Sequence, residues 1–190
     1  MFLCMTSANE YKTTSEAAML DEFLKRIAER DTDALSELYM RTKDSVFGFA
    51  LSILKNVHDA EDVLQECYLN IYSAASGYHS FGKPLAWILT ITRNLCYLKI
   101  REHEKMSTIP EEDWERYLEE KESITSEDKL VLHACMSCLT DEERQIVVLH
   151  AVSGFKHREI AELLSMRLST VLSKYNRALK KMRDYMERGV

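Results

Sequence analysis

Small polar and basic side chains recur on one face of a segment near the carboxyl end of the chain. Residues 157–164 read HREIAELL, 165–167 read SMR, and 168–183 read LSTVLSKYNRALKKMR. This pattern predicts a short amphipathic helix, a break and a longer basic helix. The longer helix has an apolar stripe formed by Leu168, Val171, Tyr175, Ala178 and Met182. Its opposite face holds Ser169, Ser173, Asn176, Arg177 and Lys180, with Lys174 and Lys181 on the flank.

Hydroxyl, amide and guanidinium groups on such a face can hydrogen-bond base edges and phosphates. The arrangement is therefore typical of a helix-turn-helix, whose second helix enters the DNA major groove. An ordinary helical hairpin with a solvated basic face is the alternative interpretation.

A second segment, residues 59–76, places acceptors and one leucine opposite an apolar stripe. The stripe consists of Ala60, Val63, Leu64, Cys67, Ile71 and Ala74. The outward face holds Asp62, Gln65, Glu66 and Ser73, with Leu69 at its centre. An apolar side chain ringed by acceptors indicates a protein-docking surface, although single exposed leucines are also common.

Aromatic, basic and amide side chains share one face of a third segment, residues 85–101. They are Thr90, Arg93, Asn94, Tyr97 and Arg101. Aromatic rings stack on bases and arginine holds phosphates, so this face suits single-stranded nucleic acid. The alternative is a core helix with a polar rim, and Trp87 is expected in the core. A loop with two aromatics precedes the segment, and Pro84 fits its first turn.

These segments are expected to lie in an all-α fold, because 190 residues contain only two Pro and five Gly. The formal net charge of −6 is concentrated between residues 102 and 128, where eleven acidic side chains face three basic ones. An acidic average therefore does not exclude nucleic acid as a partner. The expected organisation is a disordered N-terminus (1–14), a helical domain (15–104), an acidic linker (105–125) and a helix-turn-helix domain (126–190).

Local signals predict several helix ends. Ser15 is expected to cap a helix to about Arg30, and Asp33 one to about Asn56. Thr140 and Glu143 form a capping-box pattern. Arg167 is a poor N-cap, so the basic helix is predicted to begin at Ser169.

Five Cys without a signal-peptide pattern favour a reduced cytoplasm. No apolar run approaches the roughly 18 residues that span a bilayer, so no membrane insertion is expected. Cys135 and Cys138 form a CxxC after His133. A structural zinc site needs four ligands, and a second pair is missing, so neither a metal nor another cofactor is predicted.

The order of motifs resembles that of extracytoplasmic-function (ECF) sigma factors, bacterial transcription initiation factors. The motifs are DAEDVLQE (59–66), LAWILTITRN (85–94), LTDEERQIVVL (139–149), REIAELL (158–164) and the basic helix. The resemblance covers about residues 21–187. It implies a sigma region 2 domain that binds the clamp helices of the RNA polymerase β′ subunit and opens the minus-10 element. It also implies a region 4 domain that binds the minus-35 duplex near the β flap. It suggests an anti-sigma protein as a candidate partner and implies no enzymatic activity.

The resemblance also assigns residues. Asp62, Gln65 and Glu66 match the family's clamp-contacting DxxQE, and Leu69 joins them from the outward face. Arg93 and Asn94 match the RN of the minus-10-reading segment. The minus-10 set is Tyr78, His79 and Phe81 of the base-receiving loop, with Arg93, Asn94, Tyr97 and Arg101. The minus-35 set is Ser169, Thr170, Ser173, Lys174, Asn176, Arg177 and Lys180.

The chain departs from the family pattern in the helix-turn-helix. Ser165 stands where Gly is usual, Arg167 replaces a small capping residue, and Leu172 replaces a frequent Lys or Arg. Lys174 keeps the charge of the usual Arg without its bidentate geometry. These changes imply weaker minus-35 readout, with phosphate anchoring retained through Arg177, Lys180 and Lys181. In the first domain, Leu98 replaces a frequent acidic residue.

Two other classes of protein fit parts of the sequence. A stand-alone helix-turn-helix regulator would bind symmetric half-sites without polymerase. A metal-dependent phosphohydrolase could use His58, Asp59, Asp62 and Glu66, but such a site needs further ligands.

Overall fold

The computed structural model describes residues 3–80, 82–106 and 136–188. The helices in chain order are α1 (Leu3–Ala28), α2 (Thr32–Leu54), α3 (Val57–Ala74), the 3-10 helix η1 (Ala75–Gly77), α4 (Pro84–Met106), α7 (Asp141–Ala151), α8 (His157–Leu163) and α9 (Leu168–Arg188). No strand occurs within these ranges, and the predicted all-α fold class is confirmed. The expected acidic linker lies almost wholly outside the described residues.

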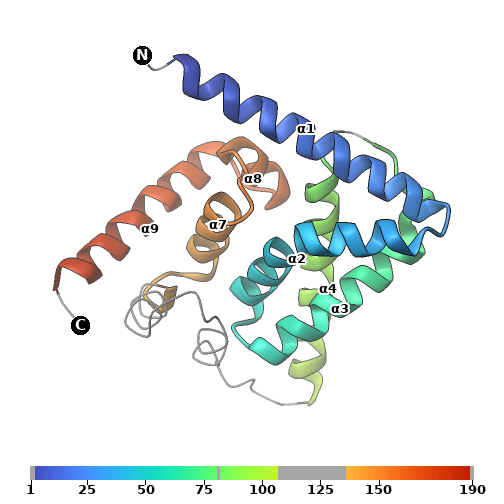
Figure 1. The fold of residues 1–190 in the computed structure, drawn as a ribbon. Coiled ribbons are helices and arrows are strands. Elements are labelled where there is room, and N and C mark those ends of the chain that lie inside the picture. Colours follow the sequence, from blue (N-terminus) through green and yellow to red (C-terminus); the bar gives the residue numbers. More distant parts are fainter. Residues whose placement is uncertain (1–2, 81, 107–135, 189–190) are drawn as a thin grey trace.

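Helix α2 lies at the centre of the molecule (Figure 1). Helices α1, α3 and α4 pack around one part of it, while α7 packs against another part and carries α8 and α9. Leu38, Phe49, Ile71 and Leu89 are among the fully buried side chains of this core. Their removal from water is the main force that holds the helices together.

Side-chain caps fix the start of α2 and α7. Oδ1 of Asp31 accepts hydrogen bonds from the backbone N–H groups of Asp33 (2.9 Å) and Ala34 (3.1 Å). The prediction that Asp33 is the cap is therefore wrong, because Asp31 has the extended backbone of a cap and Asp33 is already inside the helix. The predicted capping box of α7 is confirmed, since Thr140 N–H donates to Glu143 (3.0 Å) and Glu143 N–H to Thr140 (3.4 Å).

Two helices begin earlier than expected. Helix α1 starts at Leu3, well before the cap that the sequence predicts at Ser15. No Gly or Pro interrupts this stretch, and Ser15 lies inside a continuous helix. Helix α9 starts at Leu168, one residue before the predicted Ser169. The carbonyl of Arg167 accepts hydrogen bonds from the N–H groups of Thr170 (2.9 Å) and Val171 (3.1 Å), so Arg167 stands at the N-cap position although its side chain is a poor cap.

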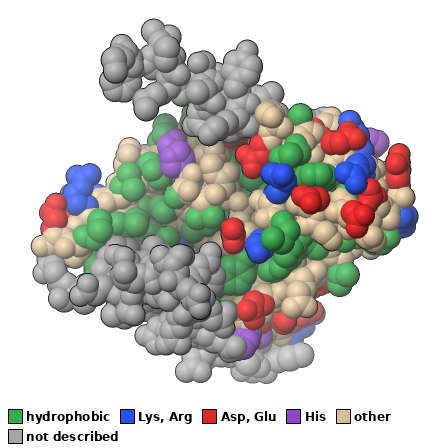
Figure 2. Space-filling model, viewed as in Figure 1, with side chains coloured by type: hydrophobic (Ala, Val, Ile, Leu, Met, Phe, Trp, Pro, Cys, Tyr) green, Lys and Arg blue, Asp and Glu red, His purple; other side chains and the backbone are tan. Residues whose placement is uncertain are grey.

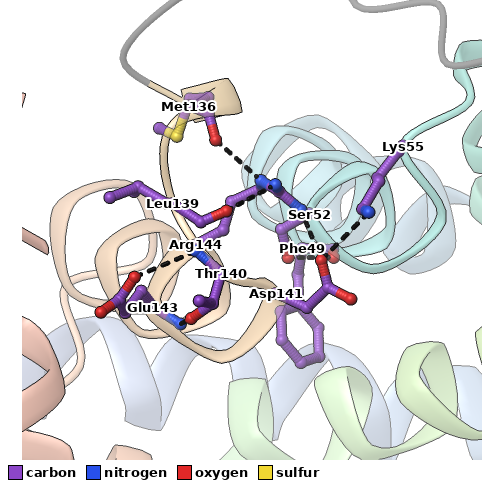
Figure 3. Close-up of polar contacts among 9 residues, drawn as sticks. All are labelled: Phe49, Ser52, Lys55, Met136, Leu139, Thr140, Asp141, Glu143 and Arg144. Atoms are coloured by element: carbon purple, nitrogen blue, oxygen red, sulfur yellow. Dashed lines mark hydrogen bonds and ion pairs between the residues drawn. The ribbon is translucent and has the colours of Figure 1, made fainter.

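The two predicted domains are in direct contact through α2 and α7. Gly48 of α2 faces this contact, and a Cβ added there would lie at ordinary van der Waals distance from Val148 (3.6 Å) and Val152 (3.8 Å). At the edge of this contact, Lys55 Nζ lies 3.1 Å from Asp141 Oδ1 (Figure 3). The sequence did not predict this contact, because a charged linker says nothing about where the domains meet.

Arg144 secures the turn before α7 and is only 4% exposed. Its guanidinium donates hydrogen bonds to the carbonyls of Met136 (3.2 Å) and Leu139 (3.0 Å) and to Asp141 Oδ1 (3.1 Å), as Figure 3 shows. A buried guanidinium is tolerated only when such acceptors surround it. The same Asp141 oxygen faces Lys55, so this turn and the contact between the domains are connected.

Ser165, in the turn of the helix-turn-helix, has a positive φ of 56°. A residue with a Cβ is strained in this left-handed region by about 1 kcal/mol, whereas Gly is not. The structure thus gives a physical reason for the Gly that the family resemblance expects at this position.

Replacing Ser165 with Gly should raise the free energy of unfolding by about 0.5 kcal/mol, because relief of strain exceeds the added freedom of the unfolded chain. Urea unfolding followed by circular dichroism measures the change. Ser36→Gly, at an exposed helical position, is the control and should lower stability by about 0.5 kcal/mol. A Ser165→Gly chain no more stable than wild type would contradict the prediction.

Candidate nucleic-acid interface

The outward face of α3 is exposed as the sequence predicted. Asp62, Gln65, Glu66 and Leu69 are all exposed, and the side chain of Leu69 is 67% accessible. Val63, Cys67 and Ile71 are buried on the opposite side of the same helix. Helical period alone therefore separates a packed face from one that a partner protein could reach.

Helix α4 holds one of these acidic residues in place. Lys99 Nζ lies 2.7 Å from Asp62 Oδ2, and this hydrogen bond raises the pKa of Lys99. Lys99 is also 3.7 Å from Asp59, whose other carboxylate oxygen lies 3.0 Å from His103 Nε2. This network could not be predicted from the sequence, because its members lie on different helices. Asp59 is buried, so it belongs to the structural support of the face rather than to its surface.

The polar face of α4 is also presented to solvent over most of its length. Thr90, Asn94, Tyr97 and Arg101 are exposed, and Arg93 is half-buried. The guanidinium of Arg93 lies 5.5 Å from the ring centre of Tyr97, and Arg101 donates to the Tyr97 carbonyl (3.2 Å). Cationic groups placed beside an aromatic ring can bind a stacked base together with its phosphate.

The loop before α4 is less accessible than the sequence implied. The hydroxyl of Tyr78 donates a hydrogen bond to Asp21 of α1, and its ring centre lies 4.8 Å from that of Trp87. Burial, and then the bond to Asp21, raise the pKa of Tyr78. Tyr78 is thus tied into the fold, while His79 is exposed. Phe81 lies outside the described residues.

Helix α8 contacts the same region of α4. The Arg93 guanidinium donates to the carbonyl of Leu163 (2.8 Å), and Lys83 Nζ lies 2.6 Å from Glu162 Oε2. Arg93 of the predicted single-strand face and Lys83 of the preceding loop are therefore engaged by the helix-turn-helix domain. These contacts could not be predicted from the sequence, since the partners are far apart in the chain.

Helix α9 exposes most of the set predicted to face duplex DNA. Ser169, Ser173, Asn176, Arg177 and Lys180 are exposed, and Thr170 is half-buried. Lys174 differs, because its Nζ lies 2.5 Å from Glu142 of α7. Lys181 likewise pairs with the buried Glu143 (2.6 Å). These two lysines face α7, whereas Arg177 and Lys180 of the predicted set remain exposed without an ion pair among the described residues.

Apolar side chains also reach the surface of α9. Leu168, Leu172 and Leu179 are each about two-fifths exposed, at 42%, 40% and 39%. Figure 2 shows hydrophobic side chains gathered on the side of the molecule where α9 lies. Leu172 stands where the family resemblance expects a cation. This part of α9 therefore presents an apolar surface in place of a positive charge.

His150, His157 and Tyr175 form an aromatic cluster where α7, α8 and α9 meet. The two imidazole centres are 4.6 Å apart, and each lies within 5.0 Å of the Tyr175 ring. His150 Nδ1 is 2.8 Å from the carbonyl of Phe155 and so carries a proton to donate. His157 Nε2 is buried and makes no hydrogen bond within the described part of the chain. Burial, and then His150, lower the pKa of His157 below its ordinary value.

Within 3–80, 82–106 and 136–188, no group of three or more His, Cys, Asp or Glu is arranged to hold a metal ion. Cys135 and His133 of the CxxC segment lie outside these ranges, and Cys138 is half-buried. No helix in the described part of the chain is long and apolar enough to cross a membrane.

The fold and these faces define an all-α protein with a bundle at its amino end and a helix-turn-helix at its carboxyl end. Residues 38–106 match the family model of Sigma-70 region 2, and residues 129–182 match that of Sigma-70, region 4. Together the two matches cover more than half of the chain. It therefore belongs to the sigma-70 family of RNA polymerase sigma factors, within the ECF group. Sigma factors are not enzymes, and membership of this family does not favour the alternative of a stand-alone helix-turn-helix regulator.

The relatives agree with this assignment. The chain is 28% identical over 179 residues to the ECF RNA polymerase sigma factor SigK of Mycobacterium bovis, covering 88% of this chain and 94% of the relative. It is 26% identical over 172 residues to SigK of Mycobacterium sp. (strain KMS), covering 87% and 89%.

Two solved structures share the fold. CnrH in complex with the cytosolic domain of CnrY has a TM-score of 0.65 at 18% identity, covering 90% of this chain and 99% of CnrH. The sigma factor RpoE from Bartonella quintana, in complex with the anti-sigma factor NepR, has a TM-score of 0.59 at 17% identity, covering 82% and 98%.

Acidification should destabilise the helix-turn-helix through His157. Because the folded state resists protonation of His157, the unfolded state binds more protons below about pH 6.5, and stability falls as pH decreases. Urea unfolding at pH 7.5 and 5.5 measures this loss. His157→Phe should make the loss smaller, whereas the exposed His79→Gln should leave it unchanged. An equal loss in wild type and His157→Phe would contradict the prediction.

Proposed function

We propose that this sigma factor directs core RNA polymerase to promoters by opening the minus-10 element with its first domain and binding the minus-35 duplex through α9. The observation that carries the proposal is the combined exposure of an acidic and apolar face on α3 and a polar, basic face on α9. Run-off transcription with core polymerase on genomic fragments tests it. Transcripts should appear only when the chain is added, and their absence would refute the proposal.

The face on α3 is the proposed contact with the β′ clamp helices. Leu69 supplies an apolar centre that loses water on binding, while Asp62, Gln65 and Glu66 surround it with acceptors. Lys99 holds the Asp62 carboxylate at 2.7 Å and so limits the rotamers that must be ordered on binding.

The face on α4 and the preceding loop are the proposed minus-10 site. Opening a duplex costs roughly a few kcal/mol for each unstacked base, so exposed bases must be captured by stacking and phosphate contacts. Tyr97, Arg93, Asn94 and Arg101 supply such groups on α4, and His79 supplies an exposed ring in the loop. Phe81 remains part of the proposed set. Tyr78 is assigned a supporting role because its hydroxyl is bound to Asp21.

Full use of Arg93 requires that α8 release it. The Leu163 carbonyl accepts a hydrogen bond from Arg93 Nη1 (2.8 Å), and while this bond persists α8 occupies that side of the guanidinium and keeps it from a phosphate. We therefore propose that the two domains separate when the chain joins polymerase and promoter DNA. An anti-sigma protein is a further proposed partner, since CnrH and RpoE were solved with CnrY and the anti-sigma factor NepR. The proposed location is the cytoplasm, without a metal or cofactor.

Replacing both Asp62 and Leu69 with Ala should weaken binding to core polymerase by about tenfold or more, because apolar anchors and their charged neighbours carry most of an interface's affinity. Both side chains are exposed, so the circular dichroism spectrum should not change. Fluorescence anisotropy with labelled chain measures the affinity.

The matched control for that variant is Leu98→Ala with Glu102→Ala, which removes an exposed leucine and an exposed acid from α4. This control should bind core polymerase like wild type. Full affinity in the Asp62→Ala, Leu69→Ala chain would remove α3 from the proposed interface.

Arg177→Ala should weaken duplex minus-35 binding and lower the slope of log affinity against log salt by about one unit, because one phosphate contact is lost. Titrations of labelled promoter duplex with holoenzyme at several salt concentrations give the slope. Lys25→Ala removes one exposed positive charge from α1 and should not change it. An unchanged slope in Arg177→Ala would argue against a groove-facing Arg177.

A further inference from the structure

Helix α1 contains an acidic residue, Asp21, that is only 9% exposed. Its Oδ2 accepts a hydrogen bond from the Ser80 hydroxyl (2.7 Å), and its Oδ1 accepts one from the Tyr78 hydroxyl. Among the described residues no Lys or Arg pairs with this carboxylate, so the two hydroxyls are the partners that make its burial tolerable. Asp21 also precedes the residues that match the Sigma-70 region 2 model.

These two bonds act on residues 78 and 80, the two neighbours of His79. Tyr78 has extended backbone, with φ −72° and ψ 126°. His79, between the two side chains bound to Asp21, is exposed. Asp21 therefore restrains the segment on both sides of His79.

The rest of the loop is anchored at both ends. The N–H of Tyr78 donates to the carbonyl of Ala75 (3.0 Å), and its ring packs against Trp87 of α4. At the far end, Pro84 begins α4 and is buried. Between these points, Asp21 holds Tyr78 and Ser80 against α1, and Lys83 pairs with Glu162 of α8.

We propose that Asp21 is a positioning residue for minus-10 recognition, which fixes the register of residues 78–80 so that His79 is presented to an unstacked base of the single strand. This inference rests on the proposed function. It assigns to α1 a part in promoter opening, although α1 itself contributes no group to the DNA-facing set.

The test uses holoenzyme formed from core polymerase and the full chain, on a promoter recovered by run-off transcription. Asp21→Ala should slow open-complex formation roughly ten- to hundredfold, as expected when two bonds to a charged acceptor are lost. Core affinity and minus-35 duplex binding should not change. Glu22→Ala, the exposed acid next to Asp21, is the matched control and should open the promoter like wild type.

Combining Asp21→Ala with a change at His79 distinguishes a positioning role of Asp21 from a general loss of structure. His79→Ala should slow opening in the wild-type background but have no further effect in the Asp21→Ala background, because His79 is no longer held outward there. Effects that multiply would overturn the inference, since the described structure gives no contact between these two side chains. A wild-type opening rate in Asp21→Ala would overturn it as well.

A second variant controls for the possibility that Asp21→Ala slows opening by misfolding the chain. The triple change Asp21→Ala, Tyr78→Phe, Ser80→Ala removes the carboxylate together with both hydroxyls, so no buried polar group loses its partner. This chain should fold like wild type and still open the promoter slowly, and normal opening would overturn the inference. If instead wild-type holoenzyme opened no promoter at all, the proposed function itself would fail, independently of Asp21.

Discussion

Burial of α2 on more than one side is the constraint on which the rest of the structure depends. From Val46 to Ile53 the chain reads VFGFALSI, and every residue of this run is buried or half-buried. A helix of this kind must be apolar around most of its circumference, because it has neighbours in several directions. Phe49 lies in the core, while Gly48 beside it faces Val148 of α7 and Val152 at its end. The same two turns therefore organise the first domain and receive the second.

The contact between the domains combines this apolar centre with a polar rim. Lys55 pairs with Asp141, Lys83 with Glu162, and Arg93 with the Leu163 carbonyl. Exposed pairs of this type contribute at most about 1 kcal/mol each, so burial of apolar surface holds the domains together. Contacts between domains of one chain generally allow relative motion unless they are large and hydrophobic. The polar side chains of this rim can therefore exchange their present partners for phosphates or protein groups when a larger binding surface is offered.

What could be predicted from the sequence was local or periodic. Thr140 and Glu143 of the capping box are three positions apart, and the buried stripe of α3 follows the helical repeat. Both patterns can therefore be recognised within a short stretch of sequence. Asp31 rather than Asp33 caps α2, because two carboxylates so close together offer the same signal and only the backbone decides between them. The bonds from Arg93 to Leu163 and from Tyr78 to Asp21 join residues far apart in sequence. A pattern within one segment does not indicate which distant segment will contact it.

Electrostatics within the helix-turn-helix domain explain how an acidic chain can present a DNA-binding face. The first turn of α7 carries Asp141, Glu142 and Glu143, which a helix amino terminus favours. Burial opposes ionisation of Glu143, but Lys181 and the hydrogen bonds from Thr140 outweigh it and lower its pKa, so the carboxylate stays charged at neutral pH. Glu142 and Glu143 thus hold Lys174 and Lys181 against α7. Because these two cations are already paired, the positive potential on the exposed side of α9 comes from side chains such as Arg177, Lys180 and Arg183.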